Sequence, residues 1–235
     1  MPISRPRRCA AAGRFHLHLT TRSVFGILTV CISACTGAAQ TFGPGLGGDI
    51  PDGEGNVTFL TSTITVSGLG PGAQLDRVSL AIEHLWVGDV VAILTAPNGE
   101  NVHLFSRLGA TPSAVLGDSS NLSLAAGPYV FAETGASFLD AAIAAPGTNS
   151  VIPGGLYAVS TTAGGFDRPP ADPDTFAAFA GDDLNGVWTL TLQDWILQSP
   201  GQLEEWTVSF VPSPGPAALL LVCGVAMLRR GVRRR

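Results

Sequence analysis

Apolar and polar positions alternate through much of the middle of this chain. The alternation is clear in residues 78–83, and residues 57–66 are rich in β-branched types. A period of two is typical of a strand with one buried face. Two further apolar runs, residues 89–96 and 101–105, flank a Pro-Asn-Gly turn, which predicts a β-hairpin.

The same pattern returns near the end of the middle region. Trp188, Leu190 and Leu192 fall on one face of a predicted strand, and residues 206–210 predict another. Between these groups of strands the composition shifts to Ala, Gly, Ser and Pro, which favours long loops, short strands and one helical turn at residues 138–144. The pattern therefore predicts an all-β fold of the sandwich type.

Charge divides the chain into a middle and two ends. All 13 basic residues are arginines, and ten of them lie in the first 22 or the last seven residues. The middle holds three arginines against all 18 carboxylates, a net charge of −15. Such a surface repels phosphate backbones, so we expect no nucleic-acid partner.

The N-terminal end is typical of an export signal. An apolar run at residues 23–34 follows the arginines, and small residues come after it. We expect a signal peptide at residues 1–39; lipidation at Cys35, in a sequence resembling a bacterial lipobox, is an alternative. All four cysteines lie in the terminal segments, so the middle must be stable without disulfides.

The C-terminal end combines prolines, a short apolar run at residues 217–228 and five arginines. Twelve helical residues span about 18 Å, less than the ~30 Å of a bilayer core. Residues 211–235 resemble a PEP-CTERM sorting signal, with Pro212, Ser213 and Pro214 in place of its usual Pro-Glu-Pro. The resemblance implies an exosortase-type partner and transient membrane anchoring at the surface of a Gram-negative bacterium; a plain C-terminal anchor is the alternative.

Three segments of the middle also carry a resemblance. They resemble the P-domain, or P/Homo B domain, of kexin- and furin-like proprotein convertases and bacterial subtilisin-like proteases. The segments are residues 84–105, 176–194 and 201–210, and residues 49–68 are similar to the start of the same domain. The resemblance covers residues 49–210 and implies a jelly-roll β-sandwich of about eight strands. In that family the domain stabilises a neighbouring catalytic domain and is not itself catalytic. An Asp-x-Gly step common in the family is absent before the last strand here.

The middle offers little for nucleophilic catalysis. Only His84 and His103 remain after the signal peptide, and a Ser-His-Asp triad needs a histidine within reach of a nucleophile. The strand phase places His84 on the inward face, which predicts a core or sheet-edge histidine. His103 follows the hairpin turn, and we expect it to face solvent. We therefore expect no enzyme activity, no catalytic residues and no organic cofactor.

Glycines at positions 43, 45 and 48 match a dinucleotide-binding spacing. That motif must follow a strand and open a helix, whereas this one follows the signal peptide. We expect a Gly-rich linker at residues 40–48 instead.

Carboxylates are the one ligand set that the middle supplies. Calcium takes roughly six to eight oxygen ligands, which loop carboxylates and carbonyls provide. We expect Asp52, Asp89, Asp183 and Asp194 to bind a structural calcium ion, the alternative being solvated turn carboxylates.

Three function classes follow. The favoured one is an exported, non-catalytic cell-surface or matrix protein that binds an extracellular ligand or builds the layer. The second is an accessory module of a separately encoded subtilisin-like serine endopeptidase, and the third is a carbohydrate-binding lipoprotein.

Overall fold

A computed structural model describes residues 38–53, 57–145, 150–159 and 175–212. These ranges leave out residues 1–37 of the predicted signal peptide and residues 213–235 of the predicted sorting signal. The four cysteines also lie outside them. No helix in the described ranges is long and apolar enough to cross a membrane.

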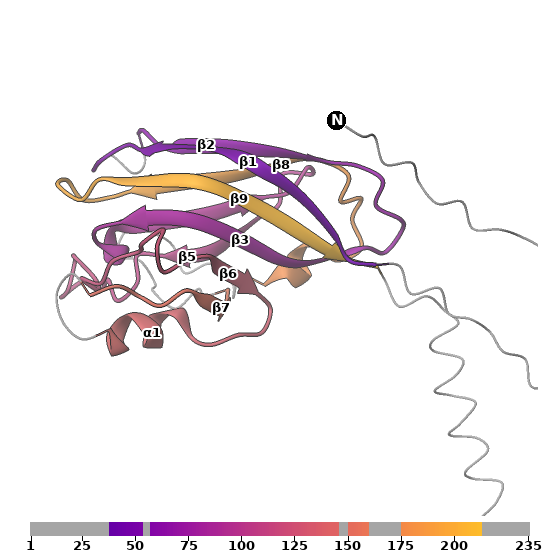
Figure 1. Ribbon diagram of the computed structural model, residues 1–235. Coiled ribbons are helices and arrows are strands. Elements are labelled where there is room, and N and C mark those ends of the chain that lie inside the picture. Colours follow the sequence, from indigo (N-terminus) through magenta and orange to yellow (C-terminus); the bar gives the residue numbers. More distant parts are fainter. Residues whose placement is uncertain (1–37, 54–56, 146–149, 160–174, 213–235) are drawn as a thin grey trace, which may run out of the picture. The chain divides into compact units, whose positions relative to one another are not determined.

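The described residues form two sheets packed face to face, with one short α-helix (Figure 1). The predicted all-β sandwich is confirmed, with nine strands in the described ranges rather than about eight. The elements are β1 Gln40–Ile50, β2 Leu60–Val66, β3 Gln74–His84, η1 Val87–Asp89, β4 Val90–Thr95, β5 Asn101–Ser106, β6 Tyr129–Ala132, α1 Phe138–Ala144, β7 Gly155–Ala158, η2 Phe176–Phe179, β8 Gly186–Asp194 and β9 Gly201–Val211.

One sheet has the order β1-β9-β3-β6-β7 and the other β2-β8-β4-β5. All neighbours are antiparallel except β6 and β7. The predicted hairpin is confirmed by the pairing of β4 with β5, in which Thr95 faces Asn101 across the turn. The helical turn expected at residues 138–144 is α1, whose N-cap Ser137 accepts a hydrogen bond from the backbone N–H of Asp140.

The predicted strand phase holds in β8. Trp188, Leu190 and Leu192 are completely buried, while Thr189 and Thr191 between them are partly exposed. The core side chains of the two sheets meet between the layers, as period-two burial requires. The phase is evident from the sequence because apolar and polar residues alternate from Trp188 to Gln193.

The Gly-rich stretch at residues 40–48 is a strand and not the expected linker. It forms most of β1 and pairs with β9 from Gln40–Phe210 to Ile50–Gly201. Glycine is needed because the side chain of Trp206, opposite Gly45 in the paired strand β9, lies against the β1 backbone: a Cβ at Gly45 would lie 2.1 Å from Trp206 Nε1. The composition typical of a flexible segment therefore serves close packing here.

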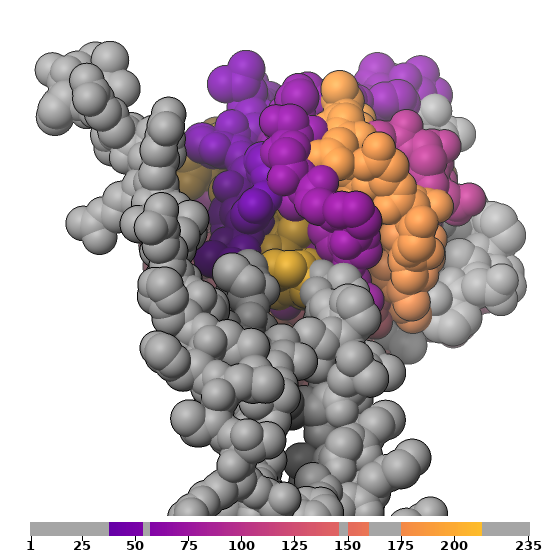
Figure 2. Space-filling model, turned by 90° about the vertical axis from the view of Figure 1, so that its right-hand side faces the viewer, coloured from indigo at the N-terminus to yellow at the C-terminus, as the bar shows by residue number. Residues whose placement is uncertain are grey.

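The pairing of Gln40 with Phe210 places the start of β1 beside the end of β9. Figure 2 shows this end of the sandwich, with the indigo atoms of β1 near the yellow atoms of β9. Aromatic rings close it: Trp188 lies 5.5 Å from Phe210 and 5.2 Å from Phe179 between ring centroids. We call this the apolar end.

Candidate functional site

Three of the four expected calcium ligands lie at the opposite end of the sandwich, which we call the charged end. Asp194 closes β8 and faces Val90 of β4, the residue after Asp89. The backbone N–H of Trp195 donates to the carbonyl of Asp89 at 3.0 Å. Asp52 follows β1 and is close enough to act electrostatically on Asp89.

The fourth residue, Asp183, does not belong to this group. It precedes β8, and Asp194 is the last residue of that strand. The nine residues of β8 span about 26 Å from the first to the last, at ~3.3 Å per step. Its carboxylate accepts hydrogen bonds from the backbone N–H and the side-chain amide of Asn185 at 3.0 and 2.8 Å. These bonds lower the pKa of Asp183, which is an exposed turn carboxylate.

His84, at the end of β3, is buried with both ring nitrogens in contact with protein atoms. Nε2 lies 3.3 Å from Asp194 Oδ2, and both side chains are fully buried. Nδ1 lies 3.1 Å from the carbonyl oxygen of Trp86 and 3.2 Å from its backbone nitrogen. The predicted core position of His84 is confirmed, and the ring joins the ends of β3 and β8.

Asp89 is the carboxylate most affected by its surroundings. It is 2% exposed, and burial together with the nearby charge of Asp194 raises its pKa from 3.8 to about 7. Arg107 and a hydrogen bond from Ser199 act in the opposite direction. Within the described residues, Asp89 Oδ1 has no hydrogen-bond partner.

Arg107 is a buried cation that sequence reasoning did not assign to a site. It is 2% exposed, its Nε donates to the carbonyl of Gly88 at 3.3 Å, and Nη2 donates to that of Val115. Its guanidinium carbon lies 5.8 Å from the centre of the Trp195 ring, within cation–π range. One sequence signal could have identified Arg107: it is a lone arginine directly after a mostly apolar predicted strand. An arginine that is buried at such a position needs polar partners.

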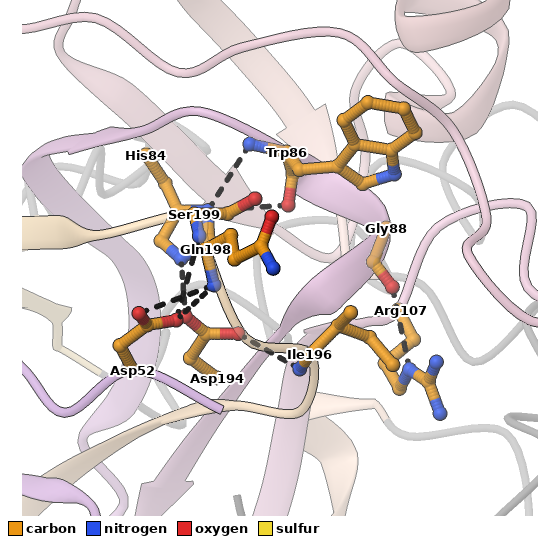
Figure 3. Close-up of polar contacts among 9 residues, drawn as sticks. All are labelled: Asp52, His84, Trp86, Gly88, Arg107, Asp194, Ile196, Gln198 and Ser199. Carbon is orange, nitrogen blue, oxygen red and sulfur yellow. Dashed lines mark hydrogen bonds and ion pairs between the residues drawn. The ribbon is translucent and has the colours of Figure 1, made fainter. Parts of the chain in front are cut away.

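Asp52 fixes the loop that joins β8 to β9. Its carboxylate accepts hydrogen bonds from the backbone N–H of Gln198 at 2.9 Å and of Ser199 at 3.4 Å (Figure 3). Asp194 Oδ1 accepts from the backbone N–H of Ile196 at 3.1 Å. Two carboxylates thus hold three backbone amides of one short loop.

These contacts also test whether the charged end fits calcium. The carboxylates of Asp52 and Asp194 already accept hydrogen bonds from backbone amides, and Asp194 also contacts His84. In the described ranges, no group of three or more His, Cys, Asp or Glu side chains is placed to hold a metal ion. The described residues therefore do not fit the shared calcium site expected for Asp52, Asp89, Asp183 and Asp194.

A groove of about 620 Å³ lies beside the charged end, on the sheet that contains β1, β9 and β3. Its volume is in the ordinary range of small-ligand sites. Pro200, from the loop that Asp52 holds, contributes to one wall. The lining residues are Asp49, Ile50, Glu83, His84, Leu85, Asn121, Leu122, Ser123, Val151, Pro200, Gly201 and Gln202.

The prediction that His103 faces solvent is wrong. His103 is 3% exposed, and burial runs without alternation from Val102 to Ser106. The pairing of β5 with β4 shifts register between Ala92 and Ile93, and η2 packs against β5. Exposure was expected because His103 follows the hairpin turn, but after a register shift of this kind burial no longer alternates along the strand.

Comparison with known proteins finds similarity to solved structures, two of which are from Aeromonas sobria. The serine protease in complex with its chaperone is 14% identical with a TM-score of 0.36, and the serine protease alone is 13% identical with a TM-score of 0.34. Each match covers 75% of this chain and 27% of that chain. No family model and no curated protein matches. The finding is a partial structural resemblance to a region of a bacterial serine protease.

Proposed function

We propose that this chain is an exported, non-catalytic module that is transiently held at the cell surface by its C-terminal segment and binds a partner through the groove beside its charged end. The observation that carries the proposal is the pairing of Gln40 with Phe210, which brings both ends of the folded body to the apolar end.

The groove lies at the other end of the same strands. Gly201, which opens β9, lines the groove, and β9 runs for 11 residues, about 33 Å at ~3.3 Å per step, to Val211 beside the apolar end. The segment predicted for export precedes β1, and the segment predicted for membrane attachment follows β9. Attachment through the C-terminal segment would therefore leave the groove at the opposite end of the body from the point of attachment.

The contacts of His84 support a non-catalytic role. A general base for a serine nucleophile needs a ring nitrogen that accepts the hydroxyl proton. Both nitrogens of His84 lie against Asp194 and Trp86 inside the protein, so this ring stabilises the fold. These contacts favour binding, or a structural contribution to the extracellular layer, over serine-protease catalysis by this ring.

Antibody labelling of intact cells tests the proposed location. A Gram-negative host expressing the full chain should be labelled by antibodies raised against the folded body without permeabilisation. A variant lacking residues 1–39 should be labelled only after permeabilisation. Equal labelling of the two variants, or casein hydrolysis by the purified full chain that His84→Ala abolishes, would overturn the proposal.

A further inference from the structure

The groove beside the charged end is built on a row of residues across three strands. Gln202 of β9 faces Asp49 of β1 on one side and Glu83 of β3 on the other. Residues directly opposite in neighbouring strands share a face of the sheet. Two strand spacings of ~4.8 Å place the backbones of Asp49 and Glu83 about 10 Å apart, with both side chains exposed.

Apolar side chains continue the groove beyond this row. The antiparallel bridge between His84 and Leu122, and the parallel bridge between Asn121 and Val151, extend the sheet sideways at this end. Leu85 and Val151 are 50% and 44% exposed, unusually high for large apolar side chains that line a concavity. The groove therefore combines two carboxylates with adjacent apolar surface.

The floor of the groove is held rigidly. A Cβ at Gly201 would lie 2.2 Å from the His84 ring and 2.8 Å from the carbonyl oxygen of Glu83, so only glycine allows this approach. The loop before Gly201 is fixed by Asp52 through the amides of Gln198 and Ser199. The exposed carboxylate of Asp52 and the buried ring of His84 thus position this wall of the groove.

Charge complementarity selects the occupant. Among the described residues that line the groove, no arginine or lysine offsets Asp49 and Glu83, and the His84 ring contacts buried Asp194. We propose that the groove binds an extended segment of a partner protein that carries an arginine or lysine beside an apolar residue. The cationic head would lie between the two carboxylates, and the apolar neighbour would cover Leu85 and Val151. This assignment rests on the proposed function, since it names the partner class of the surface module.

Fluorescence anisotropy of the full chain in nonionic detergent tests this assignment. The probe is a fluorescein-labelled hexapeptide of alternating leucine and arginine, in about 0.15 M salt, where screening acts over ~8 Å. The wild-type chain should bind it, and a peptide of alternating leucine and glutamine should bind at least about tenfold more weakly. The double variant Asp49→Asn, Glu83→Gln should weaken binding about tenfold, because each charge-assisted contact contributes a few-fold.

The matched control is Glu204→Gln with Glu205→Gln, which removes the same charge from exposed positions of β9 outside the groove. Its affinity should change less than about twofold. No binding by the wild type, equal losses in the two double variants, or equal binding of the glutamine peptide would overturn the assignment. Cell-surface labelling would be unaffected by these outcomes, so failure of the groove and failure of the proposed location are distinguishable.

Discussion

The two ends of this sandwich are closed by different chemistry. At the apolar end, Trp188 packs between Phe179 and Phe210, and its indole N–H donates to the carbonyl of Leu184 at 2.9 Å. At the charged end, His84, Asp89, Arg107 and Asp194 are all 2% exposed or less. Apolar packing stabilises in proportion to buried area and does not depend on pH, whereas buried ions depend on their partners and on protonation.

The difference corresponds to the positions of the chain ends and of the groove. The apolar end adjoins the first residues of β1 and the last residues of β9, while the charged end adjoins the groove. The apolar end depends on aromatic packing and the charged end on buried ionisable groups, so variants at the two ends should respond differently to pH.

The largest effect is expected at the apolar end. Trp188→Ala should lower the free energy of unfolding by about 3–5 kcal/mol, the range for deleting a buried aromatic side chain. Thr189→Ala, on the other face of β8, should cost less than about 1 kcal/mol. Urea denaturation of the full chain at two pH values measures both. Similar losses at the two positions would show that the strand phase is misassigned.

The next effect is a pH dependence centred on Asp89. Its pKa of about 7 lies above the ordinary 3.8, so between these values the folded state keeps a proton that the unfolded chain has released. Stability from this group therefore falls as pH rises from about 4 to 7, by up to about 4 kcal/mol at ~1.4 kcal/mol per pH unit.

Asp89→Asn should remove this loss and raise stability at pH 8 relative to the wild type. Asp183→Asn is the control, because the pKa of Asp183 is lowered and its removal acts in the opposite direction. Unfolding curves at several pH values from 4 to 8 measure the two variants. A wild-type pH dependence that persists unchanged in Asp89→Asn would contradict the assignment of a raised pKa to this carboxyl.

A third variant tests the buried cation. Arg107→Met should cost about 2 kcal/mol, because the carbonyls of Gly88 and Val115 lose a charged donor and Asp89 loses a compensating charge. Arg77→Met is the matched control, since Arg77 pairs with Asp76 at the surface and such pairs contribute about 0–1 kcal/mol. Thermal and urea unfolding compare them; equal costs would mean that Arg107 contributes only as a surface charge does.

The smallest effect is expected from calcium. The carboxylates of Asp52 and Asp194 accept hydrogen bonds from amides, so we expect melting of the full chain in millimolar CaCl₂ and in EGTA to agree within about 1 °C. Matched MgCl₂ controls for general screening of the acidic body. A larger calcium-specific shift would show that the charged end rearranges to bind the ion, in support of the expectation from the sequence for these carboxylates.

The sequence by itself determined the class of fold and the faces of several strands. Local signals that depend on neighbouring residues only are the alternation in residues 78–83 of β3 and 188–193 of β8, the β-branched residues of β2 and the Pro-Asn-Gly turn. The same reasoning located His84 in the core and grouped the carboxylates as the ionisable residues of interest.

Tertiary structure decided which of those residues meet. Asp52 and Gln198 are separated by 146 positions, and His84 and Asp194 by 110, so their contacts depend on strand order and register. Register also buried His103, and close pairing with β9 made a Gly-rich run part of β1. Local periodicity carries no information on these pairings, because they arise only when two sheets are assembled from distant segments.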